Sequence, residues 1–231
     1  MDYDARADSV AYALPEARAR FIRRTYEHLA YAILGFLVLE YVLLNLPVAA
    51  QLVQYLTYSW LLTLALFIVA SWIADRWARS EVSRGLQYAG LALYVVIEAV
   101  IFLPLLYIAI YLTRDPTVVP AAALITGLLF AGLTVVAFTT RADFSFLRGF
   151  IIIGGFVALG LIVASLLFGF TLGVIFSVAM IALAATAILY TTSNIIHYYR
   201  TDQYVAAALS LFASVALMFY YVLRILLTIR R

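Results

Sequence analysis

The chain has 231 residues, of which 67% are hydrophobic and only 12% are charged, whereas soluble domains are roughly 45–50% apolar and about 25% charged. A soluble domain of this length cannot hide so much apolar surface, so the composition predicts an integral membrane protein. The net charge of +3 comes from 15 basic residues that are all arginine. These charges are spread over short segments, which argues against nucleic-acid binding.

Seven apolar stretches have about the length that a membrane-spanning helix needs. In chain order they are Leu29–Leu46, Tyr58–Ala74, Leu86–Leu112, Val118–Thr139, Phe146–Phe168, Leu172–Ser193 and Tyr204–Leu227. The expected fold class is an all-α membrane protein, a bundle of seven transmembrane helices in which short joins make successive helices antiparallel neighbours. We divide the chain into an arginine-rich N-terminal segment, residues 1–27, and a transmembrane domain, residues 28–231.

The third stretch is longer than the bilayer requires, so we expect it to tilt, bend or protrude. Pro104 lies inside it. A proline in a helix removes one backbone hydrogen bond and favours a bend.

The arginines predict the orientation of the bundle in the membrane. Eleven fall on one side of the expected spans, three on the other, and Arg224 lies inside the last span. The eleven are Arg6, Arg18, Arg20, Arg23, Arg24, Arg76, Arg79, Arg84, Arg141, Arg148 and Arg200; the three are Arg114, Arg230 and Arg231. Because cytoplasmic loops carry the excess of basic residues, the N-terminus is expected in the cytoplasm and the protein in the inner or plasma membrane.

Few side chains are suited to cofactor or catalytic chemistry. The chain has no cysteine and only two histidines, His28 and His197. Both histidines fall at predicted helix ends, so we expect neither a metal site nor a haem. Without lysine no retinal Schiff base can form, and no Ser–His pair lies in a recognisable catalytic motif. We expect no cofactor and no enzymatic activity.

Three ionisable residues lie deep in the expected spans: Glu40, Glu98 and Arg224. Each is a candidate functional residue, because a charge inside the bilayer is costly. Arg224 is expected either to extend toward the lipid headgroups or to pair with Glu98 or Glu40. Glu40 lies near the outer end of the first span, where an interfacial position is favoured.

Polar residues are concentrated in the last two spans. Ser210, Ser214, Leu217, Tyr221 and Arg224 share one face of the seventh span because they are three or four residues apart. The sixth span ends in a polar run, residues 190–194, that includes Thr191 and Asn194. Both groups can join helices by hydrogen bonds or can line a path for water or an ion.

Five segments resemble the Bax inhibitor-1 family, and they occur in the same order as in that family. They are Ile22–Tyr26 (IRRTY), Phe102–Leu106 (FLPLL), Thr139–Leu147 (TTRADFSFL), Ile188–His197 (ILYTTSNIIH) and Ala208–Leu211 (ALSL). The fourth segment is most similar to the bacterial YccA branch of the family.

The resemblance implies six helices packed around a central seventh. It also implies one of two roles. Some family members are leak pathways for calcium, closed by a pair of carboxylates between the sixth and seventh helices that titrates with pH. YccA modulates FtsH, a membrane-bound AAA protease.

This chain departs from the family at the two acidic positions of that pair, where it has Thr191 and Ser214. Neither side chain titrates, so the carboxylate gate is replaced and calcium loses its preferred oxygen ligands. Arg224 matches an arginine of the family's last helix. We therefore expect an ion leak, with calcium or protons as candidate ions and Thr191, Asn194, Ser210 and Ser214 as pore residues. The alternative is a protein that modulates an FtsH-like protease by direct contact, and a small-solute transporter is disfavoured because no inverted repeat is evident.

Overall fold

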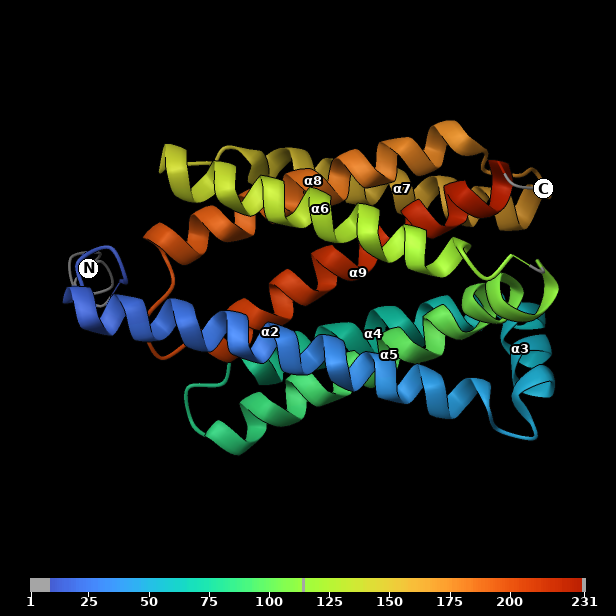
Figure 1. The fold of residues 1–231 in the computed structure, drawn as a ribbon, viewed down its shortest axis with the longest axis horizontal. Helices are drawn as coiled ribbons and strands as arrows, with labels where there is room; N and C mark the ends of the chain where they lie inside the picture. Colours follow the sequence, from blue (N-terminus) through green and yellow to red (C-terminus); the bar gives the residue numbers. More distant parts are fainter. Residues whose placement is uncertain (1–8, 114, 230–231) are drawn as a thin grey trace.

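The computed structural model describes residues 9–113 and 115–229, which form an all-α bundle (Figure 1). Arg6, Arg114, Arg230 and Arg231 of the charge count lie outside the described residues. The helices are α2 (Pro15–Leu44), α3 (Ala49–Tyr58), α4 (Trp60–Ala78), α5 (Arg84–Tyr107), the π-helical turn η1 (Ile108–Leu112), α6 (Val118–Thr140), α7 (Leu147–Phe168), α8 (Val174–His197) and α9 (Tyr204–Ile229). Among the described residues, seven helices are long and apolar enough to cross a membrane, with η1 extending α5 to Leu112. The predicted class and number of spans are confirmed.

Helix α9 occupies the centre of the bundle. In Figure 1 it runs between a layer of α2, α4 and α5 and a layer of α6, α7 and α8. Leu211, Met218 and Leu223 of α9 are completely buried. Helix α7 is the most peripheral span: it packs mainly on α8, and its Ala158 reaches Tyr221 of α9 through a small apolar cluster. The other helices thus enclose the seventh span, as the family resemblance implied.

Aromatic rings fill the contact between α2, α5 and α9. The ring of Phe102 lies 5.0 Å from that of Phe36, 5.7 Å from that of Phe219 and 5.3 Å from that of Tyr220, centroid to centroid. Such edge-to-face and stacked arrangements are the favoured geometries of aromatic pairs. The outward faces of the helices are apolar as well, for example at Leu66 and Ile153, which are 60% and 66% exposed. Lipid is the environment that suits these outward side chains.

Glycine allows α4 and α5 to approach each other closely. A Cβ atom on Gly90 would lie 2.5 Å from both the Ala74 carbonyl oxygen and the Ala78 nitrogen. Any larger residue would therefore push the two helices apart.

Three local features differ from the simple pattern of spans. Helix α2 begins at Pro15, well before the apolar stretch, because proline is favoured at the first helical turn. The join between the first two spans folds into α3, which crosses the end of the bundle in Figure 1. Helix α5 continues past Pro104, and the change in helical geometry comes four residues later in η1, where the Thr113 amide donates to the Ile108 carbonyl at 3.1 Å.

One end of the bundle gathers most of the arginines. Helices α2, α5, α7 and α9 begin there, and α4, α6 and α8 end there. We call it the arginine-rich end.

Candidate functional site

A polar cavity of about 510 Å³ lies at the arginine-rich end, between α8, α9 and the neighbouring ends of α4 and α7. Its lining consists of two arginines and hydroxyl, phenol or amide side chains: Arg79, Ser145, Arg148, Tyr190, Thr191, Asn194, Tyr198, Tyr199, Gln203 and Ser210. The cavity brings together the polar end of the sixth span and the polar stripe of the seventh.

Three of the four pore candidates, Thr191, Asn194 and Ser210, line this cavity. The fourth, Ser214, is buried one turn deeper in α9, where its hydroxyl donates to the Ser210 carbonyl oxygen at 2.9 Å. Ser214 is thus satisfied within its own helix. Farther along α9, the same polar stripe packs against α8, where the ring of Tyr221 lies 5.8 Å from the ring of Phe176.

Arg79, at the C-terminal end of α4, forms one wall of the cavity. Its Nε lies 2.9 Å from both carboxylate oxygens of Asp75, one turn earlier. Its Nη2 donates to the Ser210 hydroxyl at 3.4 Å, and the Tyr199 hydroxyl lies 3.2 Å from the same oxygen. Ser210 therefore joins the ends of α4 and α8 to α9.

The cavity lining carries positive charge. Arg79 is neutralised by Asp75, but Arg148 has no ion pair within the described ranges. No carboxylate is among the lining residues of the described chain. Such a lining attracts anions and repels divalent cations.

The loop between α6 and α7 closes another side of the cavity. The Ser193 hydroxyl accepts a hydrogen bond from the Phe144 amide at 3.0 Å and lies 3.3 Å from the Ala142 carbonyl oxygen. Asp143 accepts hydrogen bonds from the Tyr198 hydroxyl and from the Ser145 amide. The hydrogen bond from Tyr198, followed by that from the Ser145 amide, holds the pKa of Asp143 below its usual range.

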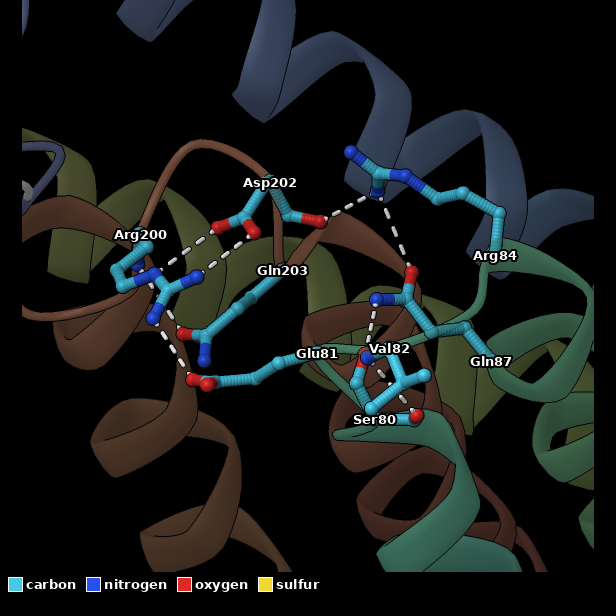
Figure 2. Close-up of polar contacts among 8 residues, drawn as sticks. All are labelled: Ser80, Glu81, Val82, Arg84, Gln87, Arg200, Asp202 and Gln203. Carbon is cyan, nitrogen blue, oxygen red and sulfur yellow. Dashed lines mark hydrogen bonds and ion pairs between the residues drawn. The ribbon is translucent and has the colours of Figure 1, made fainter.

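Ion pairs beside the cavity join the α4–α5 turn to the α8–α9 turn, as Figure 2 shows. Arg200 Nη1 lies 2.7 Å from Glu81 Oε1, and its Nη2 lies 2.9 Å from Asp202 Oδ2. Arg84 donates to the Asp202 carbonyl oxygen at 2.7 Å. The Val10 amide also donates to the Tyr199 carbonyl oxygen at 2.9 Å, so the N-terminal segment is attached to the same turn.

The deep ionisable residues do not meet as a pair. The Arg224 guanidinium donates to the Leu172 carbonyl oxygen at 2.8 Å, just before α8, and no ion pair joins it to Glu98 or Glu40 in the described part of the chain. Glu98 is 6% exposed, and the polar side chain beside it is that of Tyr94, one turn earlier in α5. The expected pairing with Glu98 or Glu40 is therefore not seen among the described residues, and extension of Arg224 toward the lipid headgroups stays a prediction.

Glu40 lies on the buried stripe of α2 and is 4% exposed. Neither of its carboxylate oxygens has a hydrogen-bond partner among the described residues. The Glu40 side chain is thus covered by the protein, and its interfacial depth near the outer end of the first span stays a prediction.

Sequence reasoning missed Arg79, Arg148, Tyr199 and Gln203 as cavity residues. The arginines were used only to predict orientation, because in sequence they lie in separate joins. Their contact with the cavity depends on how the turns fold back over α8 and α9. Within the described ranges, no group of three histidine, aspartate or glutamate side chains is placed to hold a metal ion.

A bundle of seven long apolar helices with a polar cavity at one end defines a polytopic integral membrane protein. The family model for the inhibitor of apoptosis-promoting Bax1 matches residues 18–231. The chain therefore belongs to the Bax inhibitor-1 family, whose members are generally not enzymes. It is also similar to the uncharacterized protein PA2604 of Pseudomonas aeruginosa, with 37% identity over 123 residues. That match covers 53% of this chain and about half of the relative, 55% of its length.

Proposed function

We propose that the protein is a leak pathway for small ions and that its entrance is the cavity at the arginine-rich end. The observation that supports this most directly is that Thr191, Asn194 and Ser210 line one polar cavity beside the central helix. The Thr192–His197 sequence further supports a place in the YccA branch of the family.

The lining favours a leak that is neither calcium-selective nor gated by a carboxylate pair. Calcium binds six to eight oxygen ligands, usually including carboxylates. The charged side chains in the described lining of the cavity are Arg79, which Asp75 neutralises, and Arg148. A small anion, or a monovalent ion that passes without tight binding, suits this lining better.

Apolar residues that are buried deeper in the bundle than the cavity would close such a path. Ile188 of α8 and Leu211 and Met218 of α9 are completely buried apolar residues. An apolar constriction excludes ions because it offers no replacement for their hydration shell. Conduction therefore requires α8 and α9 to separate at this level.

Flux into proteoliposomes tests the proposal. The purified protein is reconstituted, and chloride, potassium and calcium fluxes are measured with ion-sensitive dyes. Thr191→Leu should lower flux several-fold because the larger side chain fills the cavity. Thr186→Leu, on α8 but away from the cavity lining, is the matched control. Equal flux in protein-containing and empty vesicles, or no effect of Thr191→Leu, would contradict the leak.

The second candidate function is modulation of a membrane-bound AAA protease by contact. It is favoured by the folded surface at the arginine-rich end, where the N-terminal segment and two turns are joined through Tyr199 and Arg200. If this is the function, Arg200→Gln combined with Glu81→Gln should weaken co-purification with such a protease while leaving vesicle flux unchanged.

A further inference from the structure

A second hollow lies on the outside of the bundle, between α2 and α5. This groove has a volume of about 690 Å³, and apolar side chains line most of it. Its residues include the small side chains Ala32, Gly35 and Ala92, which leave room between the two helices. Larger residues beside them, Leu34 and Val38, are 57% and 63% exposed. The groove is open to the surroundings of the bundle at the depth of the apolar spans.

The groove ends in a cluster of aromatic and basic residues at the arginine-rich end. His28 and Tyr88 belong to the groove lining, and their rings stack at 5.5 Å. Two arginine side chains lie over the Tyr204 ring beside them: the guanidinium carbon of Arg24 is 5.4 Å from the ring centroid and that of Arg84 is 5.2 Å.

Neither of these two arginines has a carboxylate partner in the described part of the chain. Arg84 donates instead to the carbonyl oxygen of Asp202 and to the Gln87 side chain. By contrast, Arg20 and Arg23 on the same helix as Arg24 pair with Glu16 and Glu27. The end of the groove therefore carries two positive charges that are available to an anion.

The length of the groove matches one leaflet of a bilayer. From His28 to Leu39 it follows α2 over twelve residues, and the eleven steps between them correspond to about 16 Å at 1.5 Å per residue. The hydrocarbon core of one leaflet is about 15 Å thick. A lipid acyl chain that begins at the basic cluster would thus extend along the groove to about the middle of the membrane.

We propose that this groove binds an anionic phospholipid, with an acyl chain between α2 and α5 and the phosphate between Arg24 and Arg84. Three features support this occupant together: an apolar groove, its length of one leaflet, and two unpaired arginines at its polar end. A soluble phosphate would use only the arginines, and a neutral lipid would use only the groove. This site is separate from the polar cavity and does not depend on ion flux.

Native mass spectrometry of the full chain in detergent tests the proposal. Phosphatidylglycerol and phosphatidylcholine with identical acyl chains are added in parallel, and glycerol 3-phosphate in a third sample. We expect at least a tenfold preference for phosphatidylglycerol over phosphatidylcholine, because the choline cation offsets the phosphate charge of the latter and each basic residue near an anionic headgroup contributes about 1 kcal/mol. Equal binding of the two lipids would overturn the proposal, and so would binding of glycerol 3-phosphate as tight as that of the lipid.

Two sets of variants separate the headgroup site from the groove. Arg24→Gln with Arg84→Gln should remove most of the preference for phosphatidylglycerol, whereas Arg20→Gln with Arg23→Gln makes the same change in net charge and should retain it. Gly35→Leu should reduce binding of both lipids by filling the groove; a Cβ atom there meets only Val95, at 3.7 Å. Gly132→Leu on α6, where a Cβ atom meets nothing within 4 Å, is the control. With folding verified by thermal denaturation, unchanged lipid binding in Gly35→Leu or in the Arg24/Arg84 variant would overturn the proposal.

Discussion

Arg79, directly after α4, donates through Nη2 to the hydroxyl of Ser210 on α9, at 3.4 Å. Asp75 holds the same guanidinium from the other side, and the Tyr199 hydroxyl reaches the same serine oxygen. A single hydroxyl thus connects the central helix to two other elements at the wall of the cavity.

Ser210→Ala should therefore lower thermal stability in detergent, by about 0.5–1.5 kcal/mol in free energy of unfolding. Ser214→Ala is the matched control: its hydroxyl donates to a carbonyl of its own helix, so we expect a smaller effect. A double-mutant cycle of Ser210→Ala with Arg79→Gln should show coupling. Strictly additive losses would mean that the contact between the two residues contributes nothing to stability.

Introducing acids at the positions of the replaced carboxylate pair should make flux depend on pH. In Thr191→Asp with Ser214→Asp, one aspartate lines the cavity and the other lies one turn deeper. Two nearby carboxylates that share a proton titrate closer to neutral pH than either alone. We expect proteoliposome flux to change between about pH 6 and 8 in the double variant, while each single variant stays flat. A folded double variant with constant flux would count against the leak.

Glu98→Gln and Arg224→Gln should have nearly additive effects on thermal stability. Arg224 donates to the Leu172 carbonyl oxygen, and no ion pair joins it to Glu98 among the described residues, so neither change removes a partner of the other residue. Independent sites add to within about 0.3–0.5 kcal/mol. A direct ion pair would instead produce coupling of several kcal/mol in a double-mutant cycle.

Asp143 should contribute to the pH dependence of stability at its acidic limit. Its pKa is lowered in the folded protein by the hydrogen bond from Tyr198, followed by that from the Ser145 amide. A lowered pKa stabilises the fold above the unfolded value, near 3.9, and this contribution is lost as the pH falls through the folded value. Tyr198→Phe should raise the Asp143 pKa toward its ordinary value, as measured by carboxyl-carbon NMR. Asp143→Asn should reduce the fall in thermal stability that occurs below about pH 4. The same fall in stability in this variant as in the unchanged protein would refute this role.

The N-terminus should face the cytoplasm. The structure describes ten of the eleven arginines that are predicted to be cytoplasmic. All ten lie at the arginine-rich end, where the described chain begins. A protease-cleavable N-terminal tag should be protected in right-side-out vesicles and cleaved in inverted ones. The reverse pattern would invert the proposed topology and place the cavity on the outer side.

The number and positions of the spans could be predicted because each is a long and mostly apolar stretch, such as residues 118–139. The cavity could be predicted only in part. Thr191 and Asn194 stand out as polar residues after an apolar run. Ser210 stands out because its spacing puts it on one helical face with the other residues of the polar stripe. Arg79 and Arg148 could not be assigned to it, because they are 69 positions apart in the sequence and line the same cavity only after folding.

The groove between α2 and α5 had no signal in the sequence either. Ala32, Gly35 and Ala92 are ordinary small residues of apolar spans, and only the packing of the two helices leaves a hollow beside them. Helix α3 was missed for a similar reason: its ten residues are too few for a span, and its packing on α5 stabilises it as a helix.

The central position of α9 has a consequence for how the protein is made. The helix that fills the middle of the bundle is the seventh span to emerge from the ribosome. At about 5–20 residues per second, its 26 residues take about one to five seconds to synthesise. During that time the earlier spans are in the bilayer with their facing sides uncovered, including Glu98 and the polar end of α8. A membrane chaperone or the insertion machinery would have to shield these surfaces until the last span arrives.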